Sequence, residues 1–465
     1  MANTNTKPSA EDTRQRVQLI AKAYGNQYVR RDNKFFDLDY PGTPLSKCDV
    51  ERILLNRIRE EHPDVELSVP AVRELFELLI EAKHTDRERS FQVWNGSIAC
   101  DPGNTNRQIW VRGAMAVNLW KEPGYRQLKV NSAEFDVVGD FFDAFFQNVE
   151  EREQFVNWLA WCLQNENDKP AWAPFLYSRN KGTGKSTMCR VVTELFGVDN
   201  TAVQNNLNKI TQRFNATVLT SKLVISEETK VRPGSDQANT IKTYITDPTI
   251  LVERKGQETE RARQCCCFVF TSNFAPTWIE EGERRYYVID VNHDGCSGGP
   301  KAAQFAELVG QVHRFLDDPS NVGRLYNALM QRELPEDFSA KSLDIARHST
   351  PIMQRLQQTS RHTIVEQLEE ALNERGLVVL PEHSVVEFVR KNLSANINQT
   401  KHLMDDLEWQ KTKVKWGGKD FARAIWVKPG FAVDGGKIYG PDFETVRVAD
   451  YLEENDPLRD VEIIS

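Results

Sequence analysis

The sequence predicts a multidomain α/β protein, and three observations lead to this fold class. The chain has 465 residues, a length that suggests about three domains, each able to bury its own core. Short apolar runs that read as strands alternate with helical patterns between Lys169 and Val291, which is typical of an α/β core. Mostly helical patterns follow up to Arg375, and a different mixture of short helices and strands begins after it.

The overall composition is that of a globular protein, with 40% hydrophobic and 27% charged residues. No apolar run approaches the roughly 20 residues of a membrane helix, so no membrane partner is expected. Residues Met1–Glu11 match neither a signal peptide nor a transit peptide, and we expect a disordered tail there. The eight cysteines contain no CxxC pair, which indicates a reduced cytoplasmic protein without a zinc site. The net charge of −8 argues against a surface coated for nucleic acid but allows a local basic channel.

The most informative stretch is Ser178–Thr187, which we call the glycine loop. It follows Pro174–Tyr177, an apolar run that predicts a buried strand, and it precedes Met188–Phe196, which has a helical pattern. A strand, a glycine-rich loop and a helix in this order form the usual context of a phosphate-binding loop, because the backbone can wrap a phosphate and the amides at the helix start point at it.

The glycine loop predicts an ATP and Mg²⁺ site. Lys185 is expected to reach the β- and γ-phosphates, and the Ser186 hydroxyl is expected to hold magnesium. An ordinary glycine turn before a helix is the alternative, but it does not explain a Lys-Ser pair at the helix start. The loop departs from the usual motif in one place, since its first glycine position is occupied by Arg179. The expected nucleotide-binding residues are Gly182, Thr183, Gly184, Lys185, Ser186 and Thr187.

The region before the core is expected to be a small α+β domain. Its pattern predicts a hairpin over Tyr28–Tyr40, in which Asp37 and Asp39 resemble the metal-binding Asp-x-Asp of primase-polymerase folds. A plain hairpin edge is the favoured interpretation, because about 130 residues is short for such a domain and no further catalytic pattern follows. The other expected elements are helices at Val17–Tyr24, Cys48–Glu60 and Val69–Lys83 and strands at Phe91–Trp94 and Gln108–Val111.

Two helices that meet at Asn148 are expected within Ala133–Asn165 and would form a collar before the core. Beyond the glycine loop, the apolar strand that ends at Ser226 is followed by Glu227 and Glu228. Glu227 would hold the magnesium through water, and Glu228 would position and polarise the attacking water. The alternative is a solvated acidic turn.

A second group of expected site residues surrounds a hairpin and the next strand. The strand Phe268–Phe270 leads into Thr271, Ser272 and Asn273, and a polar side chain at this strand end can touch a γ-phosphate. Arg284 and Arg285 precede a further strand, where an arginine can reach the nucleotide of a neighbouring subunit. A surface salt bridge is the alternative for these two. The expected hairpin carries four basic residues that could contact DNA or simply be solvated: Arg254, Lys255, Arg261 and Arg263.

The C-terminal third predicts helices at Ala302–Leu316, Val322–Gln331 and Ser342–Arg375. Two short helices and a hairpin with a Gly-Gly turn come next, a pattern that is typical of a winged-helix domain. Lys413 and Lys415 on the expected wing are candidate DNA contacts, although winged helices also dock proteins. The acidic residues Glu444–Ser465 are expected to be a mobile, solvated tail.

These motifs together resemble the superfamily 3 helicases, in their phage and plasmid primase-helicase branch. The motifs of this chain occur in the same order and are of the same kind as the motifs of those helicases. They are the glycine loop, Glu227-Glu228, the basic hairpin, Thr271-Ser272-Asn273 and Arg284-Arg285. It covers about 125 residues well. The resemblance implies an AAA+-type P-loop core, a hexameric ring, ATP between subunits and single-stranded DNA gripped in the channel. It also implies that Asn273 is a sensor and that Arg284 or Arg285 is the arginine finger.

The function that these expectations favour is an ATP-dependent hexameric DNA helicase that supports replication of a phage, prophage or mobile element. It is expected to work beside a separate primase or loading protein, because no primase domain is recognisable in the chain. The alternative is an ATPase assembly or sensor module, for instance in phage defence, that binds DNA or protein without unwinding. The expected parts are a disordered tail (1–12), an N-terminal α+β domain (13–130), a helical collar (131–168), the ATPase core (169–295), a helical region (296–375), a winged-helix-like domain (376–440) and an acidic tail (441–465).

Overall fold

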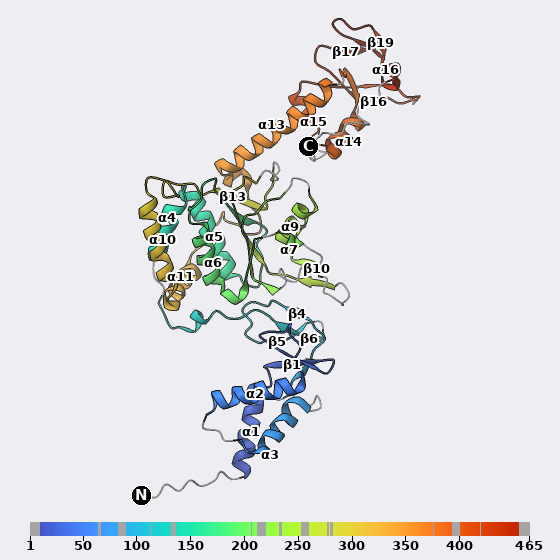
Figure 1. Cartoon of the computed structure of the whole chain (residues 1–465). Coiled ribbons are helices and arrows are strands. Elements are labelled where there is room, and N and C mark those ends of the chain that lie inside the picture. The colour runs from blue at the N-terminus through green and yellow to red at the C-terminus, as the bar shows by residue number, and fades with distance from the viewer. Residues whose placement is uncertain are drawn as a thin grey trace, which may run out of the picture.

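The computed structural model places three parts one after another along a single axis, as Figure 1 shows. The N-terminal helices and two small sheets lie at one end, a larger sheet with its helices lies in the middle, and the long helix α13 leads to the C-terminal part. The structure describes residues 10–63, 67–81, 90–111, 113–131, 136–205, 207–211, 220–231, 235–252, 260–276, 279, 282–374, 376–392, 400–418 and 420–454.

The N-terminal part confirms the expected helices and hairpin. Three helices pack around Val17, Leu54 and Leu75, all fully buried. The second of them begins at a capping box in which Ser46 and Asp49 satisfy each other's backbone amides. The first helix begins at Ala10, inside the segment that we expected to be disordered. The elements are α1 (Ala10–Tyr24), β1 (Tyr28–Arg31), β2 (Lys34–Asp37), α2 (Lys47–Glu61), α3 (Val69–Phe76), η1 (Glu77–Glu81), β3 (Gln92–Val93), β4 (Ile98–Ala99), β5 (Gln108–Val111), β6 (Ala114–Asn118) and η2 (Gly124–Gln127).

The two helices of the expected collar are α4 (Asp136–Phe145) and α5 (Val149–Gln164), and they meet at Asn148, which caps α5. They pack directly on the central sheet, and the expected division at residue 168 stays a prediction. Phe141 and Trp158 belong to the same hydrophobic core as the strands of the central sheet. The physical reason is that the aromatic stripe of these helices needs an apolar partner, and the sheet supplies it.

The central sheet has five parallel strands in the order β13-β7-β12-β9-β8. All residues of β7, β9 and β12 are buried, as expected for inner strands of a parallel sheet. The edge strand β8 was not predicted, because it has only four residues, two of them polar, and none of them is fully buried. The elements are β7 (Ala173–Tyr177), α6 (Lys185–Phe196), η3 (Val198–Asn200), β8 (Thr201–Gln204), α7 (Asn208–Thr211), β9 (Leu223–Ser226), α9 (Asp236–Thr246), β10 (Thr249–Val252), β11 (Glu260–Arg263), β12 (Cys267–Ser272), β13 (Tyr286–Asp290), α10 (Ala302–Leu316) and α11 (Pro319–Gln331).

Two buried lysines join the segment before β12 to its surroundings, which are the segment between α5 and β7 and the helix α9. Lys222 donates to the backbone oxygens of Asp168 and Cys265, each over 3.0 Å. Lys169 donates to the backbone oxygens of Tyr244 and Cys266. The three adjacent cysteines Cys265, Cys266 and Cys267 are buried here and are free thiols. Because each ammonium lacks water, its bonds to carbonyl oxygens are what make its burial tolerable.

Lys169 gives the stability of this domain a pH dependence. Burial lowers the pKa of Lys169 to about 8, below the ordinary value of 10.5. Between these two values the unfolded chain binds more protons than the folded one, so the free energy of unfolding should rise with pH. We expect a gain of about 1 kcal/mol between pH 7 and pH 9. Chemical denaturation of the wild type and of Lys169→Met at both pH values should show the wild type gaining stability relative to the variant; a constant difference would contradict this assignment.

The C-terminal part confirms the expected order of two short helices followed by a hairpin. Its first core contains Leu380, Phe388, Met404 and Trp426. Pro351 starts a new helix, so the expected stretch Ser342–Arg375 is divided in two. The elements are α12 (Ile345–His348), α13 (Pro351–Glu374), β14 (Val379–Pro381), α14 (Glu382–Asn392), α15 (Thr400–Asp406), β15 (Gln410–Val414), β16 (Arg423–Val427), β17 (Ala432–Asp434), β18 (Lys437–Tyr439), β19 (Val446–Arg447) and α16 (Val448–Glu454).

The expectation of a mobile acidic tail is wrong for residues 446–454. Strand β19 pairs with β18, and α16 buries Val448 and Leu452 against Ile438. The Tyr451 hydroxyl accepts a hydrogen bond of 3.1 Å from the amide of Val378. An apolar pair at positions i and i+4 is enough to dock a short helix even where acidic residues dominate the composition.

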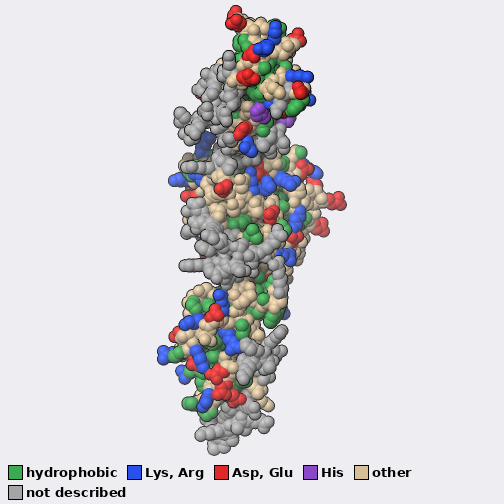
Figure 2. All heavy atoms as spheres, turned by 90° about the vertical axis from the view of Figure 1, so that its right-hand side faces the viewer, with side chains coloured by type: hydrophobic (Ala, Val, Ile, Leu, Met, Phe, Trp, Pro, Cys, Tyr) green, Lys and Arg blue, Asp and Glu red, His purple; other side chains and the backbone are tan. Residues whose placement is uncertain are grey.

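The surface charge is mixed. On the face in Figure 2, Lys and Arg side chains alternate with Asp and Glu side chains, and its described residues carry no uniform basic coat. Among the described helices, none is long and apolar enough to cross a membrane.

Candidate functional site

The candidate site lies where three neighbouring strands of the central sheet end. Strand β12 pairs with β7 on one side and with β9 on the other, and all three run in the same direction. Their carboxyl ends therefore share one edge of the sheet, which is where ligands bind in open α/β sheets. The glycine loop follows β7, Asn273 follows β12, and Glu227 with Glu228 follows β9. The structure thus brings the separate predicted motifs to one place.

Lys185 is the centre of this arrangement. It is the first residue of α6, and its ammonium donates to Asn273 Oδ1 over 2.8 Å, to Thr183 Oγ1 over 3.4 Å and to Ser178 Oγ. Burial lowers the pKa of Lys185. The amine is thus held between the glycine loop and the end of β12 by three oxygen acceptors, a set that phosphate oxygens could replace.

Two glycines let the loop pass close to its surroundings. Gly182 has a φ of 71° and Gly184 a φ of 85°, a region that other residues rarely adopt. A Cβ at Gly184 would lie 2.8 Å from the Phe305 ring, and a Cβ at Gly182 would lie 3.0 Å from Ser297 Cβ. Both positions therefore require glycine, because of the backbone conformation and because there is no room for a side chain. Glycine is required for the same reasons where a backbone wraps around a phosphate.

Residues after β13 support the glycine loop, and they were not predicted from the sequence. Asn292 Oδ1 accepts a hydrogen bond of 3.0 Å from the amide of Asn180, beside the exposed Arg179. Ser297 donates its amide to the Lys181 oxygen over 3.0 Å. The Nδ1 atom of His293 accepts a hydrogen bond from the amide of Gly295, so the ring proton is on Nε2. This Nε2 atom donates to the backbone oxygen of Thr183 over 3.1 Å. The sequence does show polar residues directly after an apolar strand. Only the pairing of β13 with β7, however, shows that these residues lie beside the glycine loop.

Ser186 and Glu227 come from two elements that are in contact, α6 and the end of β9. Ser186 is exposed, and Cys189 lies one turn further along the helix on the same face. Burial and, after it, the charge of Glu227 raise the pKa of Cys189 to about 12. Glu227 directly follows β9, which contacts α6, and a hydroxyl with one carboxylate is a donor set that suits Mg²⁺ bound together with phosphate oxygens.

Glu228 is exposed and has a φ of 49°, in the left-handed region that glutamate rarely adopts. Such backbone strain costs about 1–3 kcal/mol and often occurs at functional positions. The turn is held in place by buried hydroxyls: Ser272 Oγ donates to the Thr229 oxygen over 2.8 Å, and Thr229 Oγ1 donates to the Ser226 oxygen over 3.0 Å. The ends of β9 and β12 are thereby tied together.

The structure separates the two arginines that the sequence could not distinguish. Arg285 Nη1 forms an ion pair of 3.0 Å with Glu283, which is buried and also pairs with Lys242 at 3.1 Å. Arg284 is exposed. Arg285 is therefore part of a local network, whereas the Arg284 side chain faces solvent.

The predicted basic hairpin exists as β10 and β11, which pair from Thr249 opposite Arg263. Arg263 is exposed and donates to the Asn167 oxygen over 2.9 Å. Arg261 lies on β11, and its side chain is outside the described residues, as are Arg254 and Lys255 altogether.

The expected wing places Lys413 and Lys415 on an exposed surface. Lys413 lies on β15, and Lys415 follows that strand. Nearby, the Arg423 guanidinium lies 3.4 Å from the centroid of the Trp416 ring, and His383 stacks on the same tryptophan at 6.0 Å between centroids. The tryptophan of the wing thus packs within the domain, and the lysines remain as candidate phosphate contacts.

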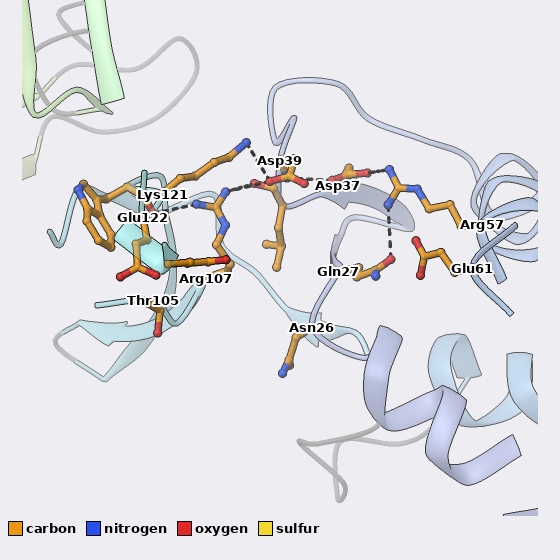
Figure 3. Close-up of a pocket in the computed structure, with 13 residues that line it drawn as sticks. Asn26, Gln27, Asp37, Asp39, Arg57, Glu61, Thr105, Arg107, Lys121 and Glu122 are labelled. Carbon is orange, nitrogen blue, oxygen red and sulfur yellow. Dashed lines mark hydrogen bonds and ion pairs between the residues drawn. The ribbon is translucent and has the colours of Figure 1, made fainter. Parts of the chain in front are cut away.

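Asp37 and Asp39 lie in a polar cavity of about 560 Å³ (Figure 3). Asp37 pairs with Arg57 at 2.9 Å, and Asp39 pairs with Lys121 at 3.2 Å and with Arg107 at 3.6 Å. Cations of the chain thus neutralise both carboxylates, which favours the hairpin-edge interpretation over a metal site. Among the described residues, no group of three or more His, Cys, Asp or Glu side chains is arranged to hold a metal.

The fold and the site define a multidomain α/β protein with a glycine loop at the carboxyl edge of a parallel sheet. Residues 176–285, which span this loop, match a family model described as a family of unknown function, DUF5906. A DNA primase-polymerase of Nitratiruptor phage NrS-1 is 25% identical over 187 residues, which cover 39% of this chain and 26% of that protein. The chain thus spans about a quarter of the length of that curated relative.

The fold has solved counterparts. Two apo structures of the NrS-1 C-terminal region superpose with TM-scores of 0.51 and 0.52 at 17% and 16% identity. They cover 86% and 88% of this chain, and 93% and 98% of their own. The chain is therefore related in sequence to a phage primase-polymerase and shares the fold of the C-terminal region of the NrS-1 protein.

Proposed function

We propose that the chain is an ATP-dependent DNA helicase or translocase of the superfamily 3 type that acts in phage replication as a ring of identical subunits, with a hexamer as the expected size. The observation that carries the proposal is the hydrogen bond between Lys185 and Asn273 at 2.8 Å. It joins the glycine loop to the end of the neighbouring strand, and a P-loop ATPase needs a lysine and a polar sensor side chain at the same phosphate.

The proposed mechanism gives each residue of this edge a task. Lys185 and the amides at the start of α6 hold the β- and γ-phosphates of ATP. Ser186 and Glu227 hold Mg²⁺, which supplies charge neutralisation at the phosphates. Glu228 orients the attacking water and takes its proton. When oxygens of the γ-phosphate bind the Lys185 ammonium, they replace Asn273 Oδ1 as its acceptor. The release of Asn273 is how the end of β12 would respond to the γ-phosphate.

The partner of this activity is proposed to be single-stranded DNA, contacted by the β10–β11 hairpin that carries Arg263 and by the wing. The sequence relationship to a phage primase-polymerase supports a role in replication over the alternative of a defence sensor or assembly module. A separate primase or loading protein is the second partner that we propose.

The test is hydrolysis of ATP with and without single-stranded DNA, together with unwinding of forked duplexes of both tail polarities. We expect DNA-stimulated hydrolysis and unwinding, and a loss of about 10²-fold in the hydrolysis rate for Lys185→Ala, because a half-buried cation that faces the phosphates is removed. Lys34→Ala is the control, since this lysine is exposed on β2 of the N-terminal part, outside the candidate site, and should leave the rate unchanged.

Hydrolysis without unwinding on either polarity would favour the sensor or assembly alternative. A Lys185→Ala variant that hydrolyses ATP at the wild-type rate would contradict the nucleotide site itself.

A further inference from the structure

A second cavity lies directly beside the glycine loop. It has a volume of about 380 Å³ and lies between α4, α10 and the loop of residues 291–301 that joins β13 to α10; we call it the α4–α10 cavity. Helices α4 and α10 lie side by side in Figure 1. The walls of the cavity include Asp143, Ala144, His293, Asp294, Phe305 and Leu308.

Two side chains of the cavity wall also touch the glycine loop. His293 shares its Nε2 proton with the Thr183 oxygen at 3.1 Å. The Phe305 ring lies so close to Gly184 that an added Cβ would come within 2.8 Å of it. The two rings contact each other edge to face at 4.4 Å between centroids. A ligand held by the glycine loop and extending over this wall would therefore enter the cavity.

The chemistry of the cavity suits a nucleoside. Apolar surface comes from Phe305, Leu308 and Ala144, and the remaining lining is polar, with side chains of Gln147, His293, Asp294, Lys301 and Gln304. A concave site that combines apolar contact surface with placed polar groups is the usual form of a small-molecule pocket. Asp143 forms an ion pair with Arg152, so the Asp294 carboxylate and the two glutamine amides supply the acceptors and donors for a base or a sugar.

The wall of the cavity is tightly built. A Cβ at Gly295 would lie 2.6 Å from Phe305 Cβ and 3.0 Å from His293 Nδ1, so this position has no room for a side chain. The amide of Gly295 donates to that same Nδ1 over 3.0 Å. The orientation of His293 toward the glycine loop is thereby fixed before any ligand binds.

We propose that the α4–α10 cavity receives the nucleobase and sugar of the nucleoside triphosphate, and that His293 is a positioning residue that couples the occupied cavity to the glycine loop. This inference rests on the proposed function, since it assumes that the glycine loop holds the phosphates. It adds where the nucleoside lies and which residue makes the loop respond to it.

The test separates the nucleoside from the phosphates by comparing ATP with inorganic tripolyphosphate in calorimetric titrations of the full chain. Leu308→Trp fills the cavity from α10, and it should weaken ATP binding at least tenfold while tripolyphosphate binds as to the wild type. Ala306→Trp is the matched control, because Ala306 is an exposed residue of the same helix and does not line the cavity. Thermal unfolding of each variant verifies that it is folded.

His293 has its own readout. His293→Ala should reduce the preference for ATP over tripolyphosphate by several fold, and His293→Gln, whose Nε2 can still donate, should restore part of it. If Leu308→Trp is unfolded, Ala144→Phe fills the cavity from α4 and takes its place in the comparison.

Equal affinities of Leu308→Trp and the wild type for ATP would overturn the cavity assignment but leave the proposed function standing. A wild-type chain that binds neither ATP nor tripolyphosphate would instead remove the proposed function, so the two failures are distinguishable.

Discussion

Under the proposed function, replacing Arg284 with alanine should lower the rate of ATP hydrolysis by about three orders of magnitude, because an arginine that a neighbouring subunit supplies to a phosphoryl-transfer transition state contributes about 10³–10⁵ in rate. Arg284 is exposed, whereas Arg285 is held at 3.0 Å by the buried Glu283. The stability of the folded chain should not change in Arg284→Ala. The measurements are steady-state hydrolysis in the presence of single-stranded DNA and thermal unfolding.

Arg285→Ala is the informative comparison. It removes one of the two cations that neutralise Glu283 and leaves Lys242 as the other, so we expect lower thermal stability as its main effect. Mixing the two inactive variants, Lys185→Ala and Arg284→Ala, offers a second control, because Lys185→Ala subunits still carry Arg284. Adding them to Arg284→Ala subunits should restore part of the hydrolysis. No recovery on mixing, or an equal loss of rate in Arg285→Ala without a loss of stability, would contradict the assignment of Arg284.

Much of the candidate site could be predicted because its signals are local. The strand before the glycine loop, the loop and α6 occupy consecutive residues, and each has its own pattern of apolar, glycine and helical positions. The acids after β9 and Asn273 after β12 were also visible as polar residues at the ends of apolar strands. Their meeting at one edge follows from the parallel pairing of β7, β12 and β9.

The features that escaped prediction depend on contacts between distant parts of the chain. His293 and Asn292 support the glycine loop from 110 and 112 residues away, and their position after an apolar strand does not show which loop they contact. Arg284 and Arg285 are neighbours in sequence and differ only in the presence of a buried partner. The edge strand β8 is only four residues long and mixes polar with apolar residues, and helix α16 is rich in acidic residues, so neither shows a clear local pattern. In each case the structure is determined by tertiary contacts, because the local sequence propensity is weak.

Breaking the buried ion pair between Arg126 and Glu166 should be the most destabilising polar change in the connection between the N-terminal part and the core. Both guanidinium nitrogens bond the carboxylate, at 2.8 and 2.7 Å, and the two side chains are 9% and 11% exposed. The guanidinium also lies 4.5 Å from the centroid of the Tyr326 ring. Glu166→Ala leaves the arginine charge buried without its partner, so we expect a loss of about 3–5 kcal/mol in the free energy of unfolding.

The double variant Arg126→Met with Glu166→Leu tests the reason for that loss. Two buried charges cost desolvation energy that their attraction only partly repays, so replacing both with apolar side chains should be much less destabilising than removing one. Chemical denaturation of the wild type, both single variants and the double variant gives the coupling between the two positions. Additive losses would mean that packing against the Tyr326 ring, and not the ion pair, stabilises this connection. A recovery in the double variant would instead show that the connection tolerates apolar contacts and that the charge pair mainly selects its geometry.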